Sequence, residues 1–150
     1  MGGIEEMVVT FCGHRQVAQR EKVEQWLRCV MVNLLQKGAT TFYLGAYGDF
    51  DSMTASILRE YKQSQPQIEL IRVLAYPPRG QEGIGYDGTV YPPLETIPRR
   101  FAITYRNRWM VEASDVVVAY VLHAGGGAAA TLRYAKQKRK VIIPFLPEQK

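Results

Sequence analysis

The chain has 150 residues and a formal net charge of +5, with 47% hydrophobic and 22% charged residues. This composition excludes a disordered, fibrous or disulfide-rich protein. The excess of positive charge favours acidic ligands, which range from free nucleotides to nucleic acid.

Several features predict a cytoplasmic protein with no membrane partner. No apolar run approaches the ~20 residues that are needed to span a bilayer. The first seven residues carry two glutamates and no basic region, unlike a secretory signal. The two cysteines, Cys12 and Cys29, fit free thiols in a reducing compartment. With the two distant histidines they form no ligand cluster, so no metal site is expected.

The first half of the chain alternates between strand and helix patterns. Short apolar runs rich in β-forming residues predict strands, and apolar residues at i, i+3, i+4 and i+7 predict amphipathic helices. The patterns predict, in order, a strand at 7–12, a helix at 16–36, a strand at 41–44, a helix from Asp51 or Ser52 to about residue 62, and a strand at 68–75.

Residues 76–98 break this alternation. They contain five prolines and four glycines and show no lasting periodicity. A structureless stretch of this length in a compact domain is usually functional or mobile. We expect it either to cover a ligand as a lid or to form a surface excursion.

The second half of the chain returns to the alternating pattern. It predicts a helix at 98–113, a strand at 116–121, a glycine turn at 125–127, a helix to about residue 138 and a strand at 141–143. The whole order predicts one Rossmann-like domain over 1–150, a three-layer α/β/α fold with a mostly parallel sheet of about five strands. In such folds ligands bind beyond the carboxyl ends of the strands, where the strand order reverses.

The turn Gly125-Gly126-Gly127 is the strongest candidate for a binding site. Glycine allows close approach of the backbone, and the helix that follows offers unpaired N–H groups, Ala128 included, to a phosphate. The turn matches neither the G-x-G-x-x-G nor the Walker A pattern. The alternative is a tight strand-to-helix turn that needs small residues for packing.

Two other turns belong to the same predicted edge of the sheet. The first holds an arginine suited to phosphate and a histidine that is either structural or an acid or base. The second holds glycines, an aromatic ring that could stack on a base, and a carboxylate that we expect to be a helix cap, with a catalytic role as its alternative. The predicted ligand-binding residues of these turns are Gly13, His14, Arg15, Gly45, Tyr47, Gly48 and Asp51. His123 beside the glycine turn is a further candidate, with packing as its alternative.

Three segments together carry a resemblance to a known family. Thr10–Arg15, Tyr43–Asp51 and Ser114–Tyr120 resemble the small bacterial and phage proteins related to YpsA. This family of unknown function belongs to the SLOG superfamily, with the DNA-processing protein DprA and the Lonely Guy phosphoribohydrolases. The resemblance implies a Rossmann-like fold, a nucleotide-derived ligand and a homo-oligomer.

Comparison with the Lonely Guy motifs separates binding from catalysis. Arg106-Asn107-Arg108-Trp109-Met110 resembles their R-K-x-x-M element, which implies a binding role for Arg106. Their P-G-G-x-G-T-x-x-E element maps onto 124–132, where the two leading glycines match and the catalytic glutamate falls on Leu132. The resemblance therefore implies a retained phosphate cradle without that family's hydrolytic carboxylate, unless Glu112 or Asp51 replaces it.

The leading hypothesis is a protein that binds or senses a small, phosphate-containing, nucleotide-like ligand at the carboxyl edge of the sheet. No other cofactor is indicated. One alternative is an enzyme of the phosphoribohydrolase type that cleaves a nucleotide N-glycosidic bond. The other is a DprA-like protein that binds single-stranded DNA, which the scattered basic residues support less strongly.

Overall fold

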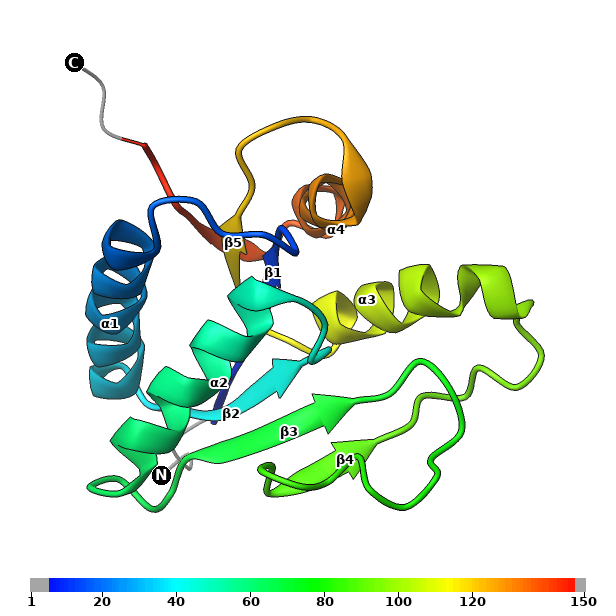
Figure 1. Ribbon diagram of the computed structural model, residues 1–150, viewed down its shortest axis with the longest axis horizontal. Helices are drawn as coiled ribbons and strands as arrows, with labels where there is room; N and C mark the ends of the chain where they lie inside the picture. Colours follow the sequence, from blue (N-terminus) through cyan, green and yellow to red (C-terminus); the bar gives the residue numbers. More distant parts are fainter. Residues whose placement is uncertain (1–5, 148–150) are drawn as a thin grey trace, which may run out of the picture.

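A six-stranded sheet forms the centre of the molecule in the computed structural model, which describes residues 6–147 (Figure 1). All five strand pairs are parallel, and the spatial order is β4-β3-β2-β1-β5-β6. The strands are β1 (Met7–Gly13), β2 (Ala39–Leu44), β3 (Glu69–Val73), β4 (Gly88–Val90), β5 (Val116–Tyr120) and β6 (Val141–Pro144).

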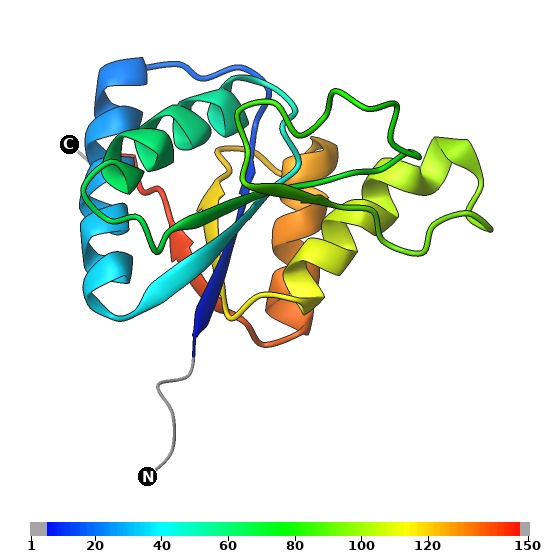
Figure 2. The same ribbon diagram turned by 90° about the horizontal axis from the view of Figure 1, so that it is seen from below.

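Helices cover both faces of the sheet (Figure 2). One pair consists of α1 (Arg20–Gln36) and α2 (Asp49–Lys62). The other pair consists of α3 (Ala102–Glu112), which follows the short 3₁₀ helix η1 (Arg99–Phe101), and α4 (Gly126–Gln137). The predicted mostly parallel α/β architecture is therefore confirmed. The helices that connect the parallel strands pack on one or the other of these two faces.

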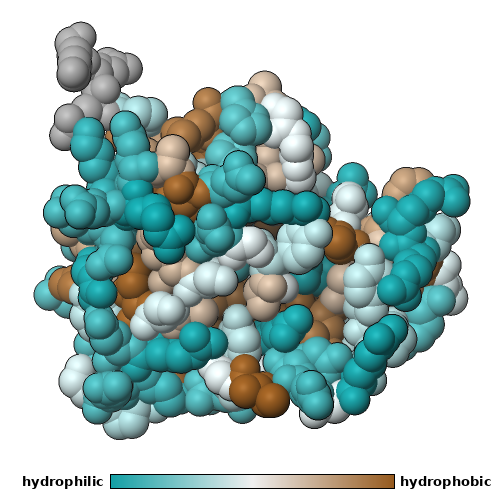
Figure 3. Space-filling view, viewed as in Figure 1, coloured by the Kyte–Doolittle hydropathy of each residue, from teal (hydrophilic) through white to brown (hydrophobic). Residues whose placement is uncertain are grey.

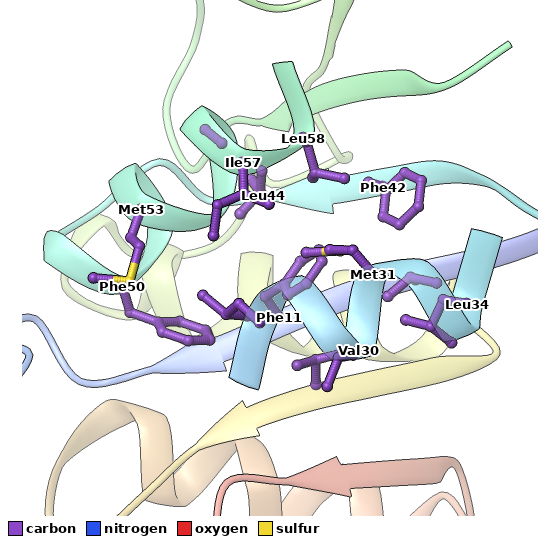
Figure 4. Close-up of a cluster of buried hydrophobic side chains, with 14 of the residues drawn as sticks. Phe11, Val30, Met31, Leu34, Phe42, Leu44, Phe50, Met53, Ile57 and Leu58 are labelled. Atoms are coloured by element: carbon purple, nitrogen blue, oxygen red, sulfur yellow. The ribbon is translucent and has the colours of Figure 1, made fainter. Parts of the chain in front are cut away.

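Alternate residues of the strands supply two separate apolar cores. Phe11 of β1 and Phe42 of β2 face α1 and α2, where they meet Met31 and Phe50 (Figure 4). Cys12, the next residue of β1, faces the other way and belongs to a smaller cluster with residues of α3 and α4. This alternation is the consequence of strand geometry, since successive side chains point to opposite faces of a sheet.

The predicted number of about five strands is wrong, because the proline-rich segment contains β4. This strand pairs with β3 through only three residues and has prolines downstream. Three residues are too few to show the alternating pattern by which a strand is recognised in sequence. The segment is thus the sixth strand with its flanking loops rather than a structureless stretch.

The helix boundaries differ from the predicted ones at two turns of the predicted site. The first helix begins at Arg20 instead of residue 16, because Gln19 adopts a left-handed conformation with φ of 54°. Residues 16–18 therefore remain in the loop after β1. At the other turn, α4 already begins at Gly126, so that two residues of the glycine turn form the first turn of the helix.

No helix within residues 6–147 is long and apolar enough to cross a membrane. The predicted absence of a secretory signal rests largely on residues 1–5, which lie outside the described part of the chain.

Substituting Gly13 by Ala tests how closely the end of β1 packs on α2. A Cβ at residue 13 would overlap the ring of Phe50, which is buried in the larger core. We expect Gly13→Ala to lower the free energy of unfolding by about 1–3 kcal/mol, measured by urea denaturation. Gly83→Ala is the control, because its Cβ would come no closer than 3.8 Å to the Thr89 side chain. Equal stability of the two variants would contradict the close packing.

Candidate functional site

A cleft of about 850 Å³ lies at the carboxyl ends of β1 and β5. This is the point where the strand order reverses, because β1 has β2 on one side and β5 on the other. The predicted site residues that line the cleft are Gly13, His14, Arg15, Gly45, Tyr47, Asp51, Arg106, His123, Gly125, Gly126, Gly127 and Ala128. Of the thirteen predicted residues, only Gly48 is not part of the lining.

The glycine turn presents bare backbone to the cleft. A Cβ added at Gly125, Gly126 or Gly127 would meet no other atom within 4 Å. Gly126 has φ of +90°, a conformation that favours glycine, but no neighbouring side chain requires the absence of a Cβ at any of the three. The turn is exposed, and the first N–H groups of α4 have no partner within the helix. Close packing therefore does not explain the three glycines.

Arg133 holds this turn from the following part of α4. Its Nη1 donates a hydrogen bond of 3.0 Å to the carbonyl oxygen of Ala124. The Thr131 hydroxyl donates to the Gly127 carbonyl at 2.8 Å, and Thr131 itself lines the cleft. Side chains of α4 thus hydrogen-bond the backbone just before the glycines, at Ala124, and at the last of them, Gly127.

Arg15 joins the turn after β1 to the turn after β2. Its guanidinium lies over the ring of Tyr47 at 4.2 Å from the ring centroid, and its carbonyl accepts the Asp49 N–H at 2.7 Å. A Cβ at Gly48 would come within 2.7 Å of the Arg15 Cα, so glycine is needed there for the two turns to approach closely. The Arg15 side chain itself is exposed and borders the cleft.

Two histidines stack at the rim of the cleft. The rings of His14 and His123 are nearly parallel, with 4.1 Å between their centroids. Nε2 of His14 accepts the Leu122 N–H at 2.8 Å, so the proton of the neutral ring lies on Nδ1. Burial, and then the neighbouring His123, lower the pKa of His14 below its usual value. This histidine is therefore neutral at neutral pH and fixed in one tautomer.

Arg106 is a buried tie between two strand ends. Its Nη1 donates to the carbonyl oxygens of Gly45 and Val73, each at 3.1 Å, and its Nε donates to Asn107. A Cβ at Gly45 would come within 2.8 Å of the guanidinium carbon, so glycine is needed there for close approach. Burial lowers the pKa of Arg106, while Asp51 opposes that shift. Arg106 therefore contributes charge to the cleft from a fixed position.

Asp51 is a carboxylate with unusual proton affinity. It is the third residue of α2, so it is not the N-cap that we expected, a position held by Gly48. One of its oxygens accepts the Tyr47 N–H at 2.9 Å, which closes the turn before the helix. Burial raises the pKa of Asp51 to about 6, against the opposing effects of that hydrogen bond and of Arg106. Such a group can exchange a proton near neutral pH.

Of the two carboxylates that could replace the missing glutamate, Asp51 lines the cleft and Glu112 does not. Glu112 ends α3 and pairs with Lys138 at 3.6 Å, outside the cleft. Leu132 packs against the smaller apolar core. Among the described residues, Asp51 is the one acidic side chain that lines the cleft.

Several lining residues were not predicted from the sequence. Gln16, Val17 and Ala18 were assigned to a helix, but they continue the loop after β1 along the cleft wall. Asn107 and Thr131 lie beside residues that had been singled out. The sequence offers one signal for them: Asn107 follows Arg106 directly on the same predicted helix, and Thr131 lies in the predicted helix that follows the glycine turn.

The segment 76–98 forms the edge of the sheet through β4 and contributes no residue to the cleft. Asp87 fixes it, because its carboxylate accepts the Leu70 N–H at 2.8 Å and the Lys62 ammonium at 2.6 Å. In this structure the segment adds β4 to the edge of the sheet, and none of its residues covers the cleft.

Comparisons with known proteins identify the class of fold. No family model and no curated protein matches the chain. Solved structures match with TM-scores of 0.58 to 0.68 at 14–19% identity, which shows a Rossmann-like α/β fold and no closer kinship.

Two of these structures are DNA processing protein A. The Helicobacter pylori protein, described by its single-stranded DNA binding mode, is 19% identical with a TM-score of 0.67, and the match covers 95% of this chain and 66% of that one. The Streptococcus pneumoniae protein is 15% identical with a TM-score of 0.68, over 97% and 52%. The chain thus spans about half to two thirds of these proteins.

Another neighbour is the molybdenum cofactor carrier protein of Chlamydomonas reinhardtii. It is 14% identical with a TM-score of 0.62, and the match covers 93% of this chain and 76% of that one. TM1055 is 17% identical with a TM-score of 0.60, over 92% and 72%.

Replacing Asp51 with Asn tests its raised pKa. The folded protein binds the Asp51 proton more tightly than the unfolded chain does, so the stability from this proton is present below the ordinary pKa of 3.8 and is lost as the pH rises through about 6. We therefore expect Asp51→Asn to gain stability over the wild type, on the order of 2 kcal/mol, between about pH 4 and pH 7.5. Urea denaturation at both pH values measures this change. A difference that does not vary with pH would contradict the shift.

Proposed function

We propose that the protein binds a small, phosphate-containing, nucleotide-like ligand in this cleft. The observation that carries the proposal is the glycine turn. A Cβ would meet no neighbour at any of its three positions, yet all three residues are glycine, which leaves the backbone uncovered. Backbone N–H groups at the start of α4, together with the positive end of the helix dipole, suit a phosphate group.

The other lining groups suit the remainder of such a ligand. Arg15 is exposed at the rim and has a guanidinium that can form two parallel hydrogen bonds with phosphate. Tyr47 is 46% exposed and offers a ring face to a base. The volume of about 850 Å³ lies within the usual range for small-molecule sites. The proposed ligand therefore has an anionic end at α4 and a planar end near Tyr47.

The structural neighbours are compatible with more than one ligand. One neighbour is described as a carrier of the molybdenum cofactor and another by its binding of single-stranded DNA. We infer from the motifs that this chain is closest in kind to the YpsA-related branch of the SLOG superfamily, and we expect a homo-oligomer. Native mass spectrometry of the freshly purified protein measures both the assembly mass and any retained ligand.

Substituting Gly125 by Asp tests the anion site directly. Gly125 has φ of −94° and open space around it, so the variant should fold without strain. The new carboxylate would occupy the helix N–H groups and repel phosphate. We expect binding of nucleoside monophosphates and ADP-ribose, measured by calorimetry, to weaken at least about tenfold, which corresponds to roughly 1.4 kcal/mol.

Gly83→Asp is the matched control, since it adds the same charge at an exposed glycine outside the cleft. It should bind like the wild type. Absence of binding by every ligand of the panel to the wild-type protein, or equal weakening in both variants, would overturn the proposed function. Inorganic phosphate is titrated in parallel to separate the phosphate contact from the nucleotide contacts.

A second candidate function is hydrolysis of the N-glycosidic bond of a nucleotide. It is favoured by Asp51, a cleft carboxylate whose pKa is raised to about 6 by burial. In this reaction water adds to the anomeric carbon, the bond from that carbon to the base nitrogen breaks, and the base leaves with a proton. A carboxylate at the sugar can take the proton from water or stabilise the developing positive charge.

The hydrolytic candidate predicts release of free base from a nucleoside monophosphate, detected by chromatography. Asp51→Asn should lower that rate by about 100-fold or more while leaving ligand affinity within a few fold. Ser52→Ala, at the exposed neighbouring position of α2, should retain the rate. No release by the wild type would exclude this candidate and leave the binding proposal untouched.

A further inference from the structure

The helical layer formed by η1, α3 and α4 carries the positive charge of the protein. Residues 96–147 contain nine lysines and arginines and only two acidic residues, whereas the rest of the chain contains ten basic and twelve acidic residues. The net charge of +5 therefore comes entirely from this part of the chain. Figure 3 shows hydrophilic residues over the end of the molecule where α3 begins.

Aromatic and basic side chains alternate along the outside of this layer. The guanidinium of Arg108 lies between two tyrosine rings, 5.4 Å from the centroid of Tyr105 and 5.2 Å from that of Tyr134. The Lys138 ammonium lies 5.5 Å from the centroid of the Tyr134 ring and also pairs with Glu112 at 3.6 Å. With Phe101, one turn before Tyr105, the two tyrosines and the two cations form what we call the aromatic–basic row.

Two rings of the row are exposed although they are large and apolar. Phe101 is 44% exposed and Tyr105 is 41% exposed, and neither belongs to the two apolar cores. The guanidinium of Arg100 lies 4.7 Å from the Phe101 ring centroid. Packing against the sheet therefore does not explain why an aromatic residue stands at either position.

The row is separate from the cleft because α3 has two different faces. Ile103, Arg106 and Asn107 line the cleft. Phe101, Tyr105 and Arg108 follow the i, i+4, i+7 spacing and lie together on another side of the helix. A ligand on the row would therefore leave the glycine turn free.

We propose that the aromatic–basic row is a docking surface for a single-stranded nucleic acid. Exposed rings provide faces on which unpaired bases stack, and the exposed guanidinium of Arg108 beside them can neutralise a phosphate. The charge argues against a second copy of this chain bound through the same face, because two basic surfaces would then oppose each other. An anionic partner that carries planar groups matches both properties of the row.

Fluorescence anisotropy with a labelled oligo(dT) of about 12 nucleotides tests this surface. We expect Tyr105→Ala to weaken binding on the order of tenfold, and Tyr105→Phe, which keeps the ring, to bind like the wild type. Arg108→Ala should lower the slope of log affinity against log salt by about one phosphate contact. Arg20→Ala is its control, since it removes an exposed arginine from α1.

The outcomes separate this surface from the proposed cleft function. Gly125→Asp should leave oligonucleotide binding unchanged even where it abolishes binding of small nucleotides. No complex at low salt, or equal effects of Arg108→Ala and Arg20→Ala, would overturn the docking proposal. A reduced assembly mass in Tyr105→Ala, with oligonucleotide affinity unchanged, would also overturn it by assigning the row to an interface between copies.

Discussion

The buried guanidinium of Arg106 connects the helical layer to the edge of the sheet where the cleft forms. The carbonyls of Gly45 and Val73 stand at or beyond the ends of β2 and β3, and both accept hydrogen bonds from this one group. A buried carbonyl without a partner costs about 1–3 kcal/mol, so the tie holds the two strand ends in place. Asp51 faces the same charge and closes the turn that Gly45 begins. These two long-range hydrogen bonds therefore help to position the side of the cleft that Gly45 and Arg106 line.

Glycines serve two different purposes around this edge. Gly13, Gly45 and Gly48 are required by close neighbours, namely Phe50, Arg106 and Arg15. The three glycines at 125–127 have no such neighbour and line the cleft with backbone that no side chain covers. The first group shapes the site and the second leaves it open. This contrast links the packing of the fold to the proposed binding of an anion.

The helix α3 connects the cleft to the opposite surface of its layer. Its inner residues, Arg106 among them, complete the cleft, and its outer residues carry exposed rings and cations. One short helix thus contributes to two surfaces of positive character, one concave and one open. We propose a small nucleotide as the ligand of the first surface and an extended strand of nucleotides as the ligand of the second.

The sequence by itself determined the alternation of strands and helices and the turns that carry glycine, because these depend on local periodicity and backbone freedom. It did not reveal β4, whose three residues are too short for a period, nor the late start of α1 at Arg20. Only the tertiary structure decided that Arg106 is a buried tie and that Asp51 is a cleft carboxylate with a raised pKa. These roles depend on burial and on partners far along the chain, which no local pattern contains.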